Sequence, residues 1–203
     1  MKISISILNA LDKINEIDNL NADFLHIDMM DGEFVPNTSF EISEILESLK
    51  EVKTKLDIHI MVNDIYKYID SLKVLKPVIL TFHYEASDKP LEIINYLKNN
   101  GIKAGVAVKP NTSIEEIKSL LPYLDLVLVM SVEPGMGGQK FMESSISKVN
   151  LLKELRQDMN YLIEVDGGVN NETIRLIENA DIAVIGSYIT KNIENYNKIK
   201  EVI

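Results

Sequence analysis

The chain has 203 residues, of which 46% are hydrophobic and 26% are charged, and this balance predicts a single globular domain, residues 1–203, with a substantial core. The formal net charge of −10, without any cluster of lysines and arginines, argues against nucleic acid as a partner. The absence of cysteine excludes disulfides and thiolate metal sites, and the N-terminal apolar run is too short for a secretory signal or a membrane span, so we expect a cytoplasmic protein with no membrane partner.

Short runs rich in Ile, Val, Leu and Phe alternate with amphipathic segments along the whole chain. The runs predict eight strands, at residues 3–7, 24–28, 55–60, 78–82, 103–108, 124–130, 162–166 and 182–185. The segments between them predict helices, among them 42–49, 66–75, 91–99, 114–121, 144–155 and 172–177. Eight strand–helix units leave about 25 residues for each, and this count favours a closed (β/α)8 TIM barrel of the α/β class over an open doubly wound sheet.

All three histidines lie at the ends of predicted strands. His26 is followed two residues later by Asp28, and side chains two apart on a strand share one face. Because the carboxyl ends of parallel strands meet at one rim of a barrel, we predict a metal site built from the chemical residues at these ends. The expected ligands are His26, Asp28, His59 and Asp166. Two imidazoles and two carboxylates suit one divalent ion per subunit, Zn²⁺, Fe²⁺, Mn²⁺ or Co²⁺, whereas core histidines and helix-capping aspartates are the structural alternative.

Other residues near these strand ends have less distinctive patterns. His83 ends the fourth predicted strand without a following aspartate, so we interpret it as a neighbour of the site or a structural residue. Asp57 lies two residues before His59 and would orient a nearby side chain. Three methionines follow predicted strand ends, namely Met30, Met61 and Met130. Methionine is usually core filler, but as a group they could form an apolar floor beside the site.

Glycine-rich turns follow the last three predicted strands, at residues 134–139, 166–168 and 186–187. Such turns can bring backbone N–H groups onto an oxyanion, and barrel enzymes often bind phosphate there. The chain has no Walker loop and no GxGxxG motif, so nucleotide binding has little support.

Residues 26–37, HIDMMDGEFVPN, resemble the HxDxMDGxFVPN signature of the ribulose-phosphate 3-epimerase family. Residues 129–141, VMSVEPGMGGQKF, and 164–169, EVDGGV, resemble two more motifs of that family, and the similarity extends from Ser6 to Ser187. The resemblance implies a phosphate-binding TIM barrel that interconverts D-ribulose 5-phosphate and D-xylulose 5-phosphate in the pentose phosphate pathway. It also implies Asp28 and Asp166 as the catalytic acid/base pair, the four metal ligands predicted above, and a homo-oligomer.

The resemblance further implies a set of substrate contacts around the rim of the barrel. These are Ser6, His59, Gly135, Met136, Gly137, Gly138, Asp166, Gly167, Gly168, Gly186 and Ser187. The chain departs from the family pattern where Glu33 replaces a usual histidine, Ile5 a common proline and Met136 a usual phenylalanine. None of these changes removes an expected ligand, although Glu33 alters the charge at the mouth of the site.

Epimerisation at C3 requires removal of a proton next to the C2 carbonyl and return of a proton to the opposite face. The second and seventh strands stand well apart around a barrel, so Asp28 and Asp166 can face each other across a planar enediolate that the metal would stabilise. One alternative is a 3-epimerase for a six-carbon ketose phosphate such as D-allulose 6-phosphate. Another is a metal-independent phosphate-binding isomerase or lyase of the tryptophan-biosynthesis type, which would leave His26 and His59 unexplained. Each alternative takes a small phosphorylated substrate.

Overall fold

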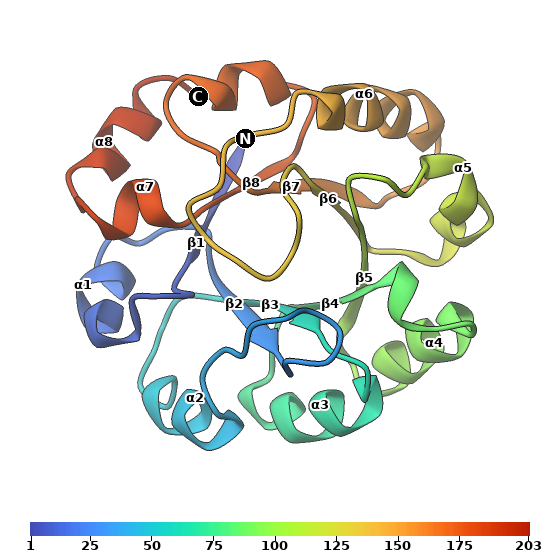
Figure 1. The fold of residues 1–203 in the computed structure, drawn as a ribbon, viewed down its shortest axis with the longest axis horizontal. Helices are drawn as coiled ribbons and strands as arrows, with labels where there is room; N and C mark the ends of the chain where they lie inside the picture. The colour runs from blue at the N-terminus through green and yellow to red at the C-terminus, as the bar shows by residue number, and fades with distance from the viewer.

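The computed structural model describes residues 1–203 and shows eight parallel strands that close into a barrel in chain order (Figure 1). The strands are β1 (Lys2–Ser6), β2 (Phe24–Met30), β3 (Leu56–Met61), β4 (Ile79–His83), β5 (Lys103–Val108), β6 (Leu126–Met130), β7 (Leu162–Asp166) and β8 (Ile182–Ile185). The predicted (β/α)8 fold class is therefore confirmed.

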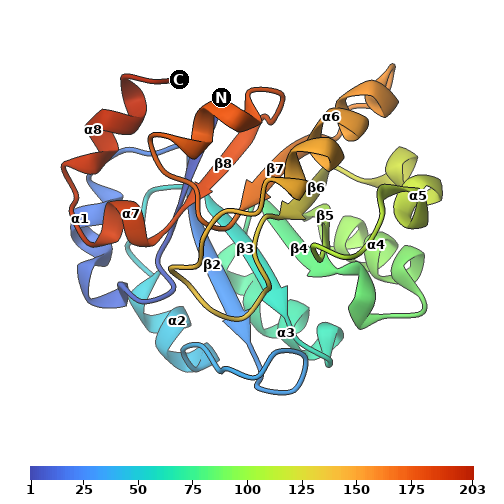
Figure 2. The same ribbon diagram turned by 45° about the horizontal axis from the view of Figure 1, so that its top comes forward.

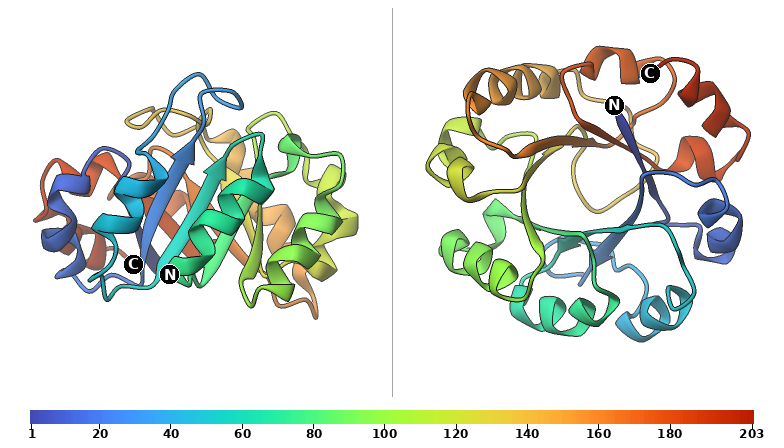
Figure 3. Two further views of the ribbon diagram at one scale, coloured as in Figure 1. Left: turned by 90° about the horizontal axis from the view of Figure 1, so that it is seen from below. Right: turned by 180° about the vertical axis from the view of Figure 1, so that it is seen from behind.

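Helices surround the barrel on its outer side (Figures 1 and 3). They are α1 (Ile14–Asp18), α2 (Ile42–Ser48), α3 (Ile65–Leu72), α4 (Pro90–Asn99), α5 (Ile114–Ile117), α6 (Ser144–Arg156), α7 (Ser187–Thr190) and α8 (Asn195–Lys200). Short 3₁₀ segments lie at Leu11–Lys13, Lys73–Leu75, Tyr84–Ala86, Lys118–Tyr123 and Thr173–Ile177. No helix reaches the length and apolarity that a membrane crossing requires.

Several predicted boundaries need correction. The helix predicted at 172–177 is a 3₁₀ segment, and α5 ends at Ile117, after which 3₁₀ structure continues through Pro122. Proline lacks an N–H group and disfavours α-helical geometry in the residue before it, which accounts for the change near Pro122. Strand β2 continues to Met30 and β3 to Met61, and β6 ends at Met130, so each of the three methionines near the site is the last residue of its strand.

Side chains alternate between the two faces of each strand, so the buried residues form two separate cores. Outward-facing apolar side chains pack against the helices in one cluster of 48 buried residues. Eight further buried residues, among them Phe24, Leu126 and Ile182, form a smaller apolar cluster. Polar side chains, including His26 and Asp57, are also fully buried. Buried polar side chains are unusual in a barrel core, and these mark the end of the barrel where a catalytic site can form.

Two loops meet over the mouth of the barrel. The β6–α6 loop passes across the opening in Figures 1 and 2, and it projects on the same side as the β2–α2 loop in the left view of Figure 3. Asn37 Nδ2 donates a hydrogen bond to Gly135 O over 2.9 Å, which ties the two loops together. The glycine-rich segment is thus held over the strand ends.

Small residues on β5 leave room for larger polar side chains on β4. Gly105 is paired in register with Thr81, and Ala107 with His83. A Cβ atom at Gly105 would clash with Thr81 Oγ1 and crowd Leu126. The packing of the barrel interior around Thr81 therefore requires glycine at position 105.

We expect Gly105→Ala to destabilise the protein by about 1–3 kcal/mol, the usual cost of overpacking a core. Denaturant unfolding followed by circular dichroism would measure the change. The matched control is Thr81→Ala together with Gly105→Ala, which removes the clashing hydroxyl and should recover part of the loss. Equal stability of Gly105→Ala and the parent would show that β4 and β5 can move apart without lowering the free energy of unfolding.

Candidate active site

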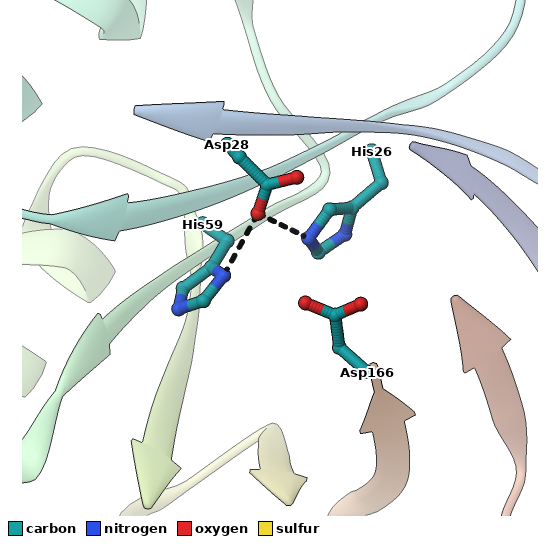
Figure 4. A group of neighbouring side chains, drawn as sticks. All are labelled: His26, Asp28, His59 and Asp166. Carbon is teal, nitrogen blue, oxygen red and sulfur yellow. Dashed lines mark hydrogen bonds and ion pairs between the residues drawn. The ribbon is translucent and has the colours of Figure 1, made fainter. Parts of the chain in front are cut away.

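The predicted metal ligands come from three strands and meet at the carboxyl end of the barrel (Figure 4). Alternation on β2 places His26 and Asp28 on the same face, and parallel pairing sets Asp28 beside His59 of β3. Asp166 is the last residue of β7 and faces them from across the opening. The structure thus brings together all four residues selected from the sequence.

The four side chains form a compact cluster. Asp28 Oδ1 lies 3.1 Å from His59 Nδ1 and 3.2 Å from His26 Nε2. One possible ligand atom from each of the four residues lies within 4.8 Å of the others. Metal–ligand bonds of about 2.0–2.2 Å put the ligand atoms of one ion roughly 3–4.4 Å apart. Small side-chain adjustments would therefore allow the four groups to share an ion.

A buried atom without a hydrogen bond supports the same fit. His26 Nε2 is fully buried and makes no hydrogen bond, although it points toward Asp28. Native proteins rarely leave such an atom unsatisfied, because its lost hydration costs free energy. Two imidazole nitrogens and two carboxylate oxygens suit Zn²⁺, Fe²⁺, Mn²⁺ and Co²⁺ alike. The residues present therefore fit a divalent metal ion.

Asp57 orients one of the two histidines, as its position in β3 suggested. Its Oδ2 accepts a hydrogen bond from His26 Nδ1 over 2.7 Å and another from the Ser4 hydroxyl over 2.9 Å. The residue that it orients is His26 of the adjacent strand, since Asp57 pairs in register with His26. With Nδ1 bound to a carboxylate, Nε2 is the nitrogen that faces the site.

Glu164 is a buried carboxyl group that the motif analysis did not single out. It lies two residues before Asp166 on β7 and joins His26 and Asp57 in a second group of close polar side chains. Burial and the nearby charge of Asp57 raise the pKa of Glu164 well above its ordinary value, so the group is protonated. The period-two spacing from Asp166 was the one available sequence signal.

The two opposing aspartates have pKa values shifted in opposite directions. Burial disfavours the charge on Asp28, but the positive charge of His26 at 3.2 Å and the hydrogen bond from His59 outweigh it and hold the pKa of Asp28 well below its usual range. Burial and the charge of Asp28 raise the pKa of Asp166 to about 6. Burial would lower the pKa of His26, but Asp57 and Asp28 raise it well above 6.5. The site therefore has one firmly ionised carboxylate and one that can hold a proton near neutral pH.

A cavity of about 260 Å³ opens beside the cluster. The expected substrate residues that line it are Ser6, Gly135, Met136, Gly137, Gly138, Asp166, Gly167, Gly168, Gly186 and Ser187. Asp28 and the methionines Met30, Met61 and Met130 also line the cavity, as an apolar floor would require. Sequence reasoning missed Lys13 and Lys191, since single lysines give no motif.

His59 is the exception among the expected substrate contacts. It is fully buried and lies outside the residues that line the cavity, so its contact with substrate stays a prediction. The turn after β7 depends on Gly168, whose φ is +64° and whose missing Cβ leaves room for the backbone of Phe141. This close approach holds the β6–α6 loop against the β7 turn on one side of the cavity.

The model of the ribulose-phosphate 3 epimerase family matches residues 2–190. The chain belongs to this family. The ribulose-phosphate 3-epimerase of Helicobacter pylori is 40% identical over 200 residues, which are 95% of this chain and 92% of that protein. The ribulose-phosphate 3-epimerase of Chlamydia trachomatis is 36% identical over 178 residues, with 85% of this chain and 76% of that protein covered.

Solved structures show the same fold at low identity. The tryptophan synthase alpha subunit of Campylobacter jejuni superposes with a TM-score of 0.68 and 20% identity, over 100% of this chain and 95% of that one. A tryptophan synthase structure from Mycobacterium tuberculosis gives a TM-score of 0.70 with 12% identity, over 99% of this chain and 89% of that one. At these identities the likeness of the epimerase-family chain to tryptophan synthase concerns the barrel alone.

Metal binding should release protons, and more of them in mild acid. At pH 7 His26 carries a proton on account of its raised pKa and must lose about one proton to ligate through Nε2. At pH 5.5 Asp166, with its pKa raised to about 6, must lose a second proton, so affinity should fall as the pH decreases. Calorimetry of Zn²⁺ or Mn²⁺ binding in buffers of different ionisation enthalpy measures both effects. Proton release that does not increase between pH 7 and pH 5.5 would contradict the assigned ligands.

Proposed function

We propose that this chain is a metal-dependent ribulose-phosphate 3-epimerase, an isomerase that interconverts D-ribulose 5-phosphate and D-xylulose 5-phosphate by two-base proton transfer at C3. Membership of the family supports the reaction. The observation that carries the mechanism is the placement of Asp28 and Asp166 on opposite sides of one cavity, with His26 and His59 beside Asp28 (Figure 4).

The two aspartates perform the proton transfers. One carboxylate removes the C3 proton of the bound ketose phosphate, which gives a planar enediolate, and the other delivers a proton to the opposite face. Asp28 is kept ionised by the histidines and is ready to accept a proton. The raised pKa of Asp166 allows it to carry a proton near neutral pH. In the reverse direction the two residues exchange roles.

A divalent ion held by His26, Asp28, His59 and Asp166 would supply Lewis-acid polarisation of the C2 carbonyl. The chain itself orients the base: Ser6 Oγ donates to Asp28 Oδ2 over 2.8 Å, which leaves Oδ1 directed at the histidines. The methionines along the cavity exclude water from the reacting carbons, which protects the enediolate from side reactions.

Glycine-rich turns support binding of the substrate phosphate. Gly167, Gly168 and Gly186 line the same cavity as the aspartates and can present backbone N–H groups to phosphate oxygens. Lys13 and Lys191 also line this cavity and provide local positive charge in a chain of net charge −10. A phosphate at this end would leave the ketose carbons directed toward Asp28 and Asp166.

Replacement of either base should nearly abolish turnover. We expect Asp28→Asn and Asp166→Asn each to lower kcat by at least about 100-fold, because a positioned general base contributes roughly 10²–10⁴-fold. A coupled assay of D-ribulose 5-phosphate conversion measures the rate, and metal content is determined in the same samples since both residues are also ligands. Asp158→Asn, which changes an exposed carboxylate between α6 and β7, is the matched control. Near-normal rates in both site variants would refute the two-base scheme.

Removal of the metal should abolish activity reversibly. After exhaustive chelation we expect less than about 1% of the original rate, in line with the loss of charge stabilisation, and recovery when Zn²⁺, Fe²⁺, Mn²⁺ or Co²⁺ is added back. The same samples are assayed with D-allulose 6-phosphate in parallel. Full activity after chelation would favour a metal-independent barrel enzyme. Faster turnover of D-allulose 6-phosphate than of D-ribulose 5-phosphate would show that the six-carbon ketose phosphate is the preferred substrate.

A further inference from the structure

The face of His59 that points away from the site is held by a second histidine. His59 Nδ1 faces Asp28, whereas its Nε2 lies 2.9 Å from Nε2 of His83. His83 ends β4, is fully buried and packs against the ring of Phe34 with a centroid distance of 4.9 Å. Its remaining nitrogen, Nδ1, lies 3.1 Å from Glu85 Oε2. The residues His59, His83 and Glu85 thus form a continuous chain of contacts.

The hydrogen atoms of this chain have one arrangement that leaves Nδ1 of His59 able to bind a metal ion. A carboxylate only accepts hydrogen bonds, so His83 Nδ1 must carry the hydrogen that it donates to Glu85. A neutral His83 then has a lone pair at Nε2, and the 2.9 Å contact requires a hydrogen on Nε2 of His59. When a metal ion occupies Nδ1 of His59, in place of the hydrogen that this nitrogen directs at Asp28, Nε2 of His59 carries the hydrogen that His83 accepts.

The pKa shifts of His83 and Glu85 agree with this arrangement of hydrogen atoms. Burial, the largest cause, lowers the pKa of His83 to about 4, although Glu85 opposes it, and the ring is therefore neutral at pH 7. Burial disfavours the charge of Glu85, but hydrogen bonds from His83, Thr112 and the Lys109 backbone lower its pKa to about 2. Glu85 is therefore ionised and His83 neutral throughout the physiological range.

Glu85 is in turn fixed by the β5–α5 loop. Its Oε1 accepts hydrogen bonds from the Lys109 backbone N–H over 2.8 Å and from the Thr112 hydroxyl. The ammonium group of Lys148, on α6, donates to the carbonyl groups of Lys109, Pro110 and Thr112 at 2.8, 2.7 and 2.6 Å. The loop is therefore anchored to a long helix, and the side chain of Glu85 is only 21% exposed.

We propose that Glu85 and His83 are positioning residues, which act in series to fix the hydrogen of His59 on Nε2 and so present Nδ1 to the metal ion. This inference rests on the metal dependence proposed above and extends it beyond the ligand set. Asp57 acts on His26 directly, whereas the support for His59 passes through a second imidazole. Without an acceptor at position 85, His83 can reverse its hydrogen and His59 can place its own hydrogen on the ligating nitrogen.

The first test measures the position of the hydrogen directly in the Zn²⁺-loaded protein. Long-range ¹H–¹⁵N spectra of the imidazole groups at pH 7 distinguish Nδ1–H from Nε2–H in each histidine. We expect His83 of the parent protein to be the Nδ1–H form and Glu85→Ala to show a mixture of both forms. A parent protein with hydrogen on Nε2 of His83 would overturn the proposal without any variant.

The second test measures metal affinity by competition with a chelator, using Zn²⁺ or Mn²⁺ alone as the probe. Glu85→Ala should weaken binding about 10–100-fold, the usual effect of losing a partner behind a ligating histidine. Glu85→Gln keeps an oxygen that accepts from His83 and should stay within about threefold of the parent. Glu115→Ala, which removes an exposed carboxylate from the neighbouring helix α5, is the matched control.

A double variant tests whether the two residues act in series. His83→Phe removes the acceptor for His59, so adding Glu85→Ala to it should cause no further loss of affinity. Additive losses, or equal affinity of Glu85→Ala and the parent with an unchanged His83 form, would refute the positioning role and leave the proposed function intact. A parent protein that binds no metal and keeps full activity after chelation would instead refute the metal dependence itself. Denaturant unfolding of each variant separates these effects from loss of the fold.

Discussion

The parallel register of β2 and β3 is the constraint on which the site depends. It places Asp28 beside His59 and His26 beside Asp57, so two layers of polar side chains lie one above the other inside the barrel. Barrel closure then brings β7 opposite β2, which sets Asp166 across the opening. A shift of one residue in this pairing would turn the whole set toward the helices, where no water, substrate or ion could reach it.

The interior of the barrel balances charge over short distances. His26 lies between Asp28 and Asp57, and its raised pKa reflects both neighbours. Glu164 avoids a third negative charge in the lower layer because it keeps its proton. Several buried polar atoms of this network make no hydrogen bond, and among them Nε2 of His26 lies where a metal ion would complete the network.

Much of the fold and the cluster of candidate ligands could be predicted from the sequence, because both follow from local periodicity. Continuous apolar runs marked the eight strands, and the HxD spacing placed His26 and Asp28 on one face. The boundaries that failed have local causes, such as the 3₁₀ geometry around Pro122 and the two further residues of β2. His83 was recognised only as a neighbour of the site, since nothing in ILTFHYEA indicates which ring nitrogen it meets.

The sequence by itself determined the succession of strands and helices, the family, and which residues of β2, β3 and β7 form the cluster at the carboxyl ends. Tertiary structure alone decided the protonation pattern. The raised pKa of Asp166, the protonated Glu164 and the chain from Glu85 through His83 to His59 all arise from groups that are distant in sequence. Periodicity specifies the face on which a side chain lies, whereas charge and hydrogen bonding depend on distances of about 3 Å between strands, which only the closed barrel establishes.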